Sequence, residues 1–185
     1  MSRRNTVSRV LHDLGAAAWF GGSLMGAVGL NQASGIVSDP QDRAPVASAG
    51  WAAWSPVNAA AIGAHVIGGL GLLQANRGRV KHQSGTRANT VLKTALTGAA
   101  LGATAYSGVL GARVASAGRV PTEAGTRPSE GTPTTVASAQ QQLRVVQWAI
   151  PVLTGTLVAL GAQQGEQQRA GQVARGVLST FTPHR

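Results

Sequence analysis

Four apolar blocks, separated by polar segments, dominate the pattern of hydrophobic and polar positions. They lie at about residues 11–30, 56–74, 91–111 and 143–162. A helix rises about 1.5 Å per residue, so about twenty residues cross a hydrocarbon core of about 30 Å. The pattern therefore predicts an all-α fold: a four-transmembrane-helix bundle in a single domain, 1–185.

The connection at 31–55 is polar and ends in Trp51 and Trp54. Their amphipathic rings suit a boundary between membrane and water. Pro56 fits the first position of the second helix, where its missing N–H costs nothing, and Ser55 fits the N-cap before it. We therefore expect the second helix to begin at Pro56.

The connection at 112–142 is rich in Pro, Thr, Ser and Gly. That composition predicts a long irregular extracytoplasmic loop. The tail at 163–185 is polar, with Val173, Val177 and Phe181 spaced for one face of a short surface helix. The alternative is a disordered cytoplasmic tail.

Basic residues give the chain a formal net charge of +10. Eleven of its 16 Lys and Arg residues fall in the N-terminal leader, the segment 75–93 and the tail, and the other five fall in or directly beside the other two connections. Basic residues gather on the cytoplasmic side of membrane proteins, so we expect a plasma-membrane protein with both termini inside. No basic patch is interleaved with aromatic residues, which disfavours nucleic-acid binding.

The first apolar block has a second interpretation as a cleaved signal peptide. Ser2, Arg3 and Arg4 resemble a twin-arginine start. Thr6, however, occupies a position where that signal has a large apolar residue, and Asn31 would fall at a small-residue position of the cleavage site. We favour a retained helix.

Small residues repeat at four-residue spacing within the blocks, as at Gly22 and Gly26, and at Gly98 and Gly102. Lipid supplies no hydrophobic drive between helices, so such residues favour close helix packing. The spacing does not separate packing within the chain from a homo-oligomer. The sequence contains no Cys, which excludes disulfides, thiolate metal sites and Cys nucleophiles.

His65 lies at the centre of the second block and is the first candidate for chemistry. An ionisable residue at the bilayer midplane is a functional candidate by default. Asn58, Thr97, Thr104 and Thr154 fall near it on expected helix faces, and together they predict a polar seam. The simpler interpretation, which we favour, is that a neutral histidine hydrogen-bonds a neighbour and fixes helix pairing.

His12 and Asp13 are expected at the cytoplasmic edge of the first helix. Asp13 suits the helix dipole there without any further function. The expected depths of His12 and His65 differ by more than about 10 Å at about 1.5 Å per residue, which disfavours a bis-His haem between them. No metal or nucleotide motif is present, and we expect neither cofactor nor metal.

Three stretches, LHDLGAAAWFGGSLMGAVGLN, WSPVNAAAIGAHVIGG and ALGAQQGEQQ, resemble a family of uncharacterised four-helix integral membrane proteins of actinobacteria. The resemblance covers most of the chain. It implies the same four-helix fold and carries over no activity and no functional residues.

These observations favour a non-enzymatic membrane protein that acts as an interaction, scaffold or accessory subunit. Its expected partners are the lipid bilayer and a larger membrane complex or further copies of the chain. The alternative is a small transporter or ligand-binding protein with a polar midplane site around His65. An enzyme acting on membrane-embedded substrates ranks third.

Overall fold

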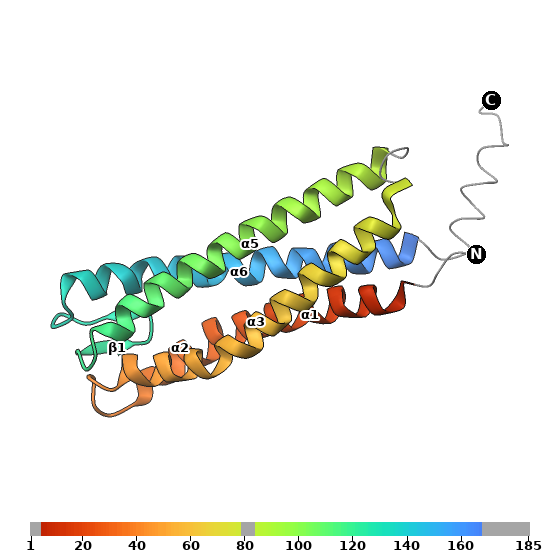
Figure 1. Ribbon diagram of the computed structural model, residues 1–185. Helices are drawn as coiled ribbons and strands as arrows, with labels where there is room; N and C mark the ends of the chain where they lie inside the picture. Colours follow the sequence, from red (N-terminus) through yellow and green to blue (C-terminus); the bar gives the residue numbers. More distant parts are fainter. Residues whose placement is uncertain (1–4, 79–83, 168–185) are drawn as a thin grey trace.

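The computed structural model describes residues 5–78 and 84–167, and four long helices account for most of them. They are α1 (Thr6–Met25), α3 (Arg43–Ala75), α5 (Ser84–Ser116) and α6 (Thr134–Gln167). Figure 1 shows them running lengthwise beside one another. The all-α class with four main helices is confirmed. The tail beyond 167, including the expected surface helix, lies outside the described residues.

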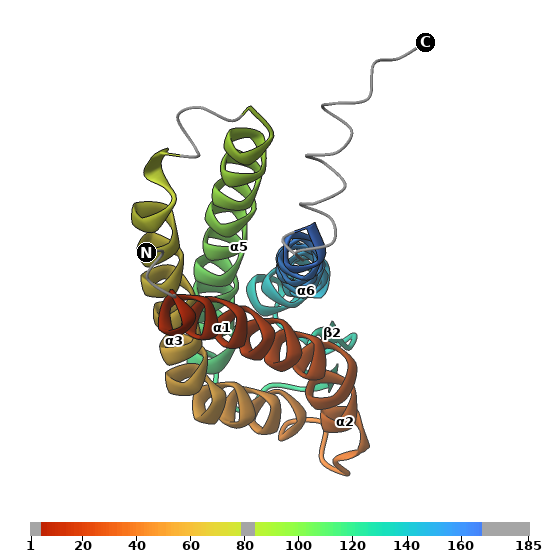
Figure 2. The same cartoon turned by 90° about the vertical axis from the view of Figure 1, so that its right-hand side faces the viewer.

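The bundle is held together mainly by three helix pairs. α1 packs along both α3 and α6, and α5 packs along α6, whereas α3 and α5 touch only over a short length. Figure 2 shows the bundle from its end, with α1 between α3 and α6. The contact between α3 and α5 is therefore the weakest side of the bundle.

Two helices are long and apolar enough to cross a membrane by length and composition, α3 and the Thr134–Gln163 part of α6. α1 carries Arg9, His12 and Asp13 within its length, and these residues lower its hydropathy. α5 is diluted by Gly, Thr and Ser. Among the described residues, α1 and α5 therefore do not meet this criterion of length and composition.

α3 begins at Arg43 and continues through Pro56, so the expected start at Pro56 is wrong. The missing N–H of Pro56 frees the carbonyl of Ala52, at the cost of one helical hydrogen bond. The neighbouring Ser55 hydroxyl donates to the Trp51 carbonyl at 2.8 Å, a bond within its own helix. α3 changes direction along its course (Figure 2), and an internal proline is a common cause of such a bend. The longer helix places His65 past its centre, on the Ala75 side.

The helical path of α1 does not stop at Met25. It continues through a π-helical turn, η1 (Gly26–Leu30), then α2 (Asn31–Ala33) and the 3₁₀ turn η2 (Ser34–Ile36). The connection to α3 is correspondingly short. Only residues 37–42 join the two helical segments.

The connection between α5 and α6 is shorter and more ordered than an irregular loop. It contains an antiparallel hairpin of β1 (Thr122–Ala124) and β2 (Arg127–Pro128). Its turn residue Gly125 donates from its N–H to the Asn31 carbonyl at 3.2 Å and to the Ser34 hydroxyl at 2.8 Å. A Cβ at Gly125 would lie 2.7 Å from Ala47 Cβ, so the close approach requires glycine. The hairpin thus caps one end of the bundle.

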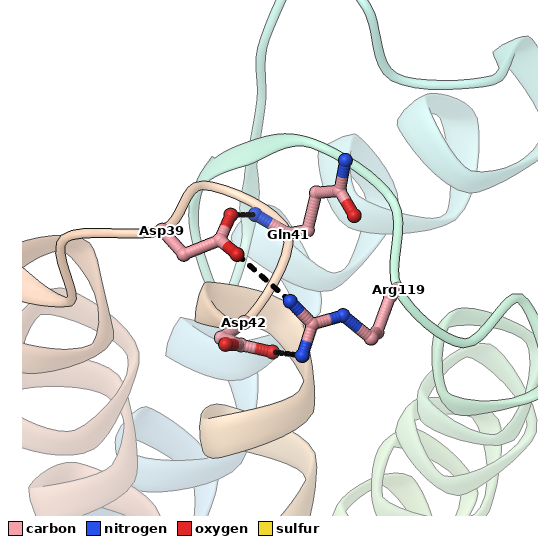
Figure 3. Close-up of polar contacts among 4 residues, drawn as sticks. All are labelled: Asp39, Gln41, Asp42 and Arg119. Atoms are coloured by element: carbon pink, nitrogen blue, oxygen red, sulfur yellow. Dashed lines mark hydrogen bonds and ion pairs between the residues drawn. The ribbon is translucent and has the colours of Figure 1, made fainter.

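Arg119 ties the start of this connection to the start of α3. Its guanidinium forms ion pairs of 2.8 Å with Asp39 and 2.6 Å with Asp42, and Asp39 also accepts from the backbone N–H of Gln41 (Figure 3). These side chains are partly exposed, so the pairs add little stability by themselves. They fix the relative position of two connections that are far apart in sequence.

Candidate functional site

α1 and α3 cross at a contact built from the same four-residue pattern on each helix. The pattern is His-x-x-Gly, at His12 to Gly15 and at His65 to Gly68. A Cβ at Gly15 would lie 2.5 Å from the backbone N of His65, and a Cβ at Gly68 would lie 2.4 Å from the backbone N of His12. The two backbones therefore meet with no side chain between them.

The two histidines of this contact bond to each other reciprocally. His12 Nδ1 lies 3.0 Å from the His65 carbonyl oxygen, and His65 Nδ1 lies 3.0 Å from the His12 carbonyl oxygen. The rings stack with centroids 4.1 Å apart and planes 18° apart. We call this arrangement the histidine clasp.

A carbonyl oxygen can only accept, so each Nδ1 in the clasp carries the proton and donates. That leaves Nε2 of a neutral His65 as an acceptor, and the Thr97 hydroxyl lies 3.2 Å from it. Every polar atom of the His65 ring has a partner, although the side chain is only 1% exposed. Buried polar groups matched in this way stabilise a helix pairing rather than weaken it.

The expected depth difference between His12 and His65 is wrong, because α3 extends further than expected and brings both rings to one level. The depth argument against a haem between them fails with it. Haem ligation would need the rings to separate and turn a nitrogen toward a shared iron, and that rearrangement would break the two Nδ1 hydrogen bonds. Among the described residues, no three His, Cys, Asp or Glu side chains gather as a metal site.

Two of the candidate residues lie apart from His65: Thr154, an expected member of the polar seam, and Asp13, the expected membrane-edge residue. Thr154 is fully buried, but its hydroxyl donates to the Ile150 carbonyl of its own helix at 2.8 Å. Asp13 points toward α6, where a Cβ at Gly161 would lie 3.8 Å from its Oδ1, and it interacts electrostatically with Lys93. Neither side chain contacts His65.

Trp19 lies between the histidine clasp and the rest of the bundle interior. Its indole is fully buried and packs edge-on against His65, with centroids 6.2 Å apart. The indole N–H donates to the Thr104 hydroxyl at 3.2 Å, and the Ser23 hydroxyl donates to the Trp19 carbonyl at 2.7 Å. Thr104 and Ser23 face a cavity on the other side of this tryptophan.

The cavity has a volume of about 310 Å³ and occupies the half of the bundle nearest the hairpin. α3 contributes Trp51, Trp54 and Asn58 to its wall, and the hairpin turn at Gly125 and Thr126 closes its end. The two indoles are seated over α1, since a Cβ at Gly22 or Gly26 would clash with them. Further polar lining residues come from all four helices: Ser23, Asn31, Ser48, Ser55, Thr104, Ser107 and Gln147.

Three polar atoms on the cavity wall are buried without a hydrogen-bond partner. They are Trp54 Nε1, Asn58 Oδ1 and Ser107 Oγ, out of seven such atoms in the described part of the chain. Leaving a buried polar group unmatched costs about 1–3 kcal/mol. That three of the seven belong to residues lining one cavity suits a site whose wall a polar ligand group completes after small side-chain movements.

Asn31 anchors the hairpin end of the cavity in the opposite way, with its hydrogen bonds satisfied. Its amide N–H donates to Gln147 Oε1 at 2.6 Å, and its Oδ1 accepts from Trp51 Nε1 at 2.9 Å. Gln140 also holds the hairpin, donating to the Ala124 and Gly125 carbonyls at 3.1 Å. Asn31 and Gln140 thus tie α2 and α6 to this end of the cavity, although Thr122 Oγ1, Arg127 Nε and Gln140 Oε1 around the hairpin are themselves buried without a partner.

Sequence reasoning identified His65, Thr97, Thr104 and Asn58 but placed them in a single seam. The structure divides them between the clasp, which holds His65 and Thr97, and the cavity, which holds Thr104 and Asn58. The sequence pattern did not indicate that Trp54, Ser107 and Asn31 line a cavity. The repeated His-x-x-Gly pattern was readable in the sequence, whereas the cavity depends on helix register.

No protein-family model, curated protein sequence or solved structure matches the chain. The geometry of the clasp and the cavity is therefore the basis for inferring the function of the chain.

Replacing either glycine of the crossing should destabilise the protein. Gly15→Ala and Gly68→Ala each push a Cβ into the backbone of the other helix, and overpacking of this kind costs at least about 1–3 kcal/mol. Gly21→Ala and Gly63→Ala are matched controls on the same two helices, because nothing lies within 4 Å of a Cβ there. Thermal unfolding in detergent should separate the pairs; equal melting temperatures would contradict the crossing.

Proposed function

We propose that the chain is a four-span plasma-membrane protein that binds a small uncharged ligand in the cavity between its helices. The distribution of exposed apolar side chains supports the membrane arrangement of all four helices. The unmatched polar atoms of the residues that line the cavity support the ligand.

The membrane arrangement is supported by the large apolar side chains on the outside of the bundle. Each long helix exposes some of them, with Leu14 66%, Ile67 64%, Val91 61% and Val152 64% exposed. The interior is mixed, with apolar clusters around Trp19 and Leu110 and buried His, Asn, Gln, Ser and Thr side chains. In water, so much exposed apolar surface would promote aggregation, whereas in lipid it is solvated.

The orientation follows from the charge bias, with both termini and the segment 76–83 inside and the hairpin outside. Because the chain lacks Cys, single-cysteine labelling tests this directly. A membrane-impermeant maleimide should label Glu130→Cys on intact cells and Gly78→Cys only after permeabilisation. The reverse pattern, or recovery of the protein in the soluble fraction, would contradict the arrangement.

The ligand proposal depends on one observation, the convergence of three unmatched polar atoms on one cavity. A volume of about 310 Å³ lies at the lower end of the range of about 300–1,000 Å³ found for ligand pockets. The lining contains no Asp, Glu, Lys, Arg or His. A ligand that enters it without a counter-charge must itself be uncharged, since an unpaired buried charge is very costly.

Two matched asparagine substitutions test the ligand site. Asn58→Leu removes an unmatched buried oxygen, so it should leave the ligand-free protein equally stable or more stable by about 1–3 kcal/mol while abolishing ligand retention. Asn31→Leu breaks satisfied hydrogen bonds and should destabilise the protein by a similar amount. Mass spectrometry after mild extraction would measure retention. Destabilisation by Asn58→Leu with ligand unchanged would contradict the site.

An accessory-subunit role remains the second candidate, because one predicted packing row lacks a partner. Gly98 and Gly102 on α5 are exposed, and nothing lies within 4 Å of a Cβ at either position. Of the two alternatives left open by the spacing, packing within the chain does not use this row, and the row is open to another helix. The same mild extraction would reveal a co-purifying protein in place of a small molecule.

A further inference from the structure

We propose that the ligand is a hydroxyl-bearing neutral lipid that enters the cavity sideways from the bilayer, between α3 and α5. This inference rests on the proposed ligand-binding function and adds the chemical class of the ligand and its route. Four properties of the cavity carry it: the mixture of hydrogen-bonding groups, the absence of charge, the size, and the position of its open side.

The unmatched atoms require a ligand group that both donates and accepts. Trp54 Nε1 can only donate, Asn58 Oδ1 can only accept, and the Ser107 hydroxyl can do either. An alcohol group matches this mixture in kind, because its oxygen accepts from an indole N–H and its proton is donated to an amide or hydroxyl oxygen. An ester or ether alone would leave Asn58 unmatched.

The uncharged lining excludes the commonest lipid headgroups. No Lys or Arg lines the cavity to match a phosphate, and no Asp or Glu lines it to match an ammonium group. Arg43 and Arg119 lie near this end of the bundle but are engaged in the cap, with Val37 and with Asp39 and Asp42. A neutral alcohol headgroup is therefore favoured over a phospholipid.

The size of the cavity indicates that only part of the lipid is enclosed. About 310 Å³ corresponds to roughly ten water molecules at about 30 Å³ each, enough for a glycerol-sized head and the first carbons of a chain. A longer hydrocarbon chain must leave through an opening.

The opening lies where α3 and α5 face each other. On α3 the lining residues Ala52 and Ser55 are exposed, and on α5 the lining residues Gly108, Ala112 and Ala115 are exposed. These two helices make the weakest pairing in the bundle. Small residues on both sides leave room for a chain, and in a four-span protein this side faces lipid.

Three lipids with the same oleoyl chains separate the chemical classes: dioleoylglycerol, dioleoyl phosphatidate and trioleoylglycerol. Native mass spectrometry of the purified full-length protein in detergent would compare them by titration. We expect the diacylglycerol to bind at least about tenfold more tightly than either other lipid. The triacylglycerol lacks the hydroxyl that forms the hydrogen bonds, and the phosphatidate would bury an unpaired charge. Ser107→Ala should weaken diacylglycerol binding about fivefold and leave trioleoylglycerol unchanged.

Adjacent tryptophan substitutions test the route. Ala52→Trp places a large ring in the opening, whereas Ala53→Trp adds the same ring to an exposed position that does not line the cavity. Ala52→Trp should slow the appearance of the diacylglycerol complex by at least about tenfold when the lipid is supplied in phosphatidylcholine vesicles, and Ala53→Trp should not.

Equal binding of phosphatidate and diacylglycerol would overturn the lipid class, and equal uptake rates for the two tryptophan variants would overturn the route. If no lipid binds but a water-soluble molecule is retained and lost in Asn58→Leu, the further inference fails while the proposed function stands. If the unaltered protein retains neither a lipid nor a water-soluble molecule, both fail.

Discussion

The crossing of α1 and α3 at the histidine clasp is the contact from which the rest of the bundle follows. Gly15 and Gly68 remove every side chain between the backbones, and His12 and His65 then bond across the gap. In lipid, where apolar surface gives no net drive for association, close packing and hydrogen bonds supply the specificity. The reciprocal bonds form in one register only.

That register also places the tryptophans of the cavity. With the helices antiparallel and Gly15 beside His65, Gly22 and Gly26 come to lie under Trp54 and Trp51. The two indoles occupy the widening space between the helices and hold the wall of the cavity. Asn31 then closes its end by bonding Gln147 and Trp51. The α1–α3 crossing thus determines the position of both the histidine clasp and the cavity.

The contrast between matched and unmatched polar groups distinguishes structural from functional positions. His65, buried in the clasp, has partners for both ring nitrogens, so its burial is explained by helix pairing. Asn58 and Ser107 are half-buried residues whose Oδ1 and Oγ atoms are buried without a partner, and helix pairing does not explain them. His65 is therefore assigned to structure, whereas Asn58 and Ser107 are the residues on which the proposed ligand site depends.

The sequence predicted four helices, because each block of apolar residues is long enough to form one. It failed at Pro56, since a proline inside a helix is tolerated where the packing of the whole helix compensates for one lost hydrogen bond, and a local pattern does not record that packing. That boundary error displaced His65 toward the helix centre and hid its pairing with His12. The hairpin was missed because Gly125 is held by Asn31 and Ser34, residues distant in sequence.

Disulfide formation across the α1–α3 crossing tests the register of these two helices most directly, because the chain has no native cysteine. A Cβ at Gly71 would lie 3.1 Å from Ser8 Cβ, close to the Cβ separation of about 3.5–4.5 Å in disulfides. We expect Ser8→Cys with Gly71→Cys to cross-link readily in membranes under mild oxidation, and Ser8→Cys with Gly63→Cys to remain reduced. Cross-linking of the Gly63 pair instead, or of neither pair, would contradict the register set by the histidine clasp.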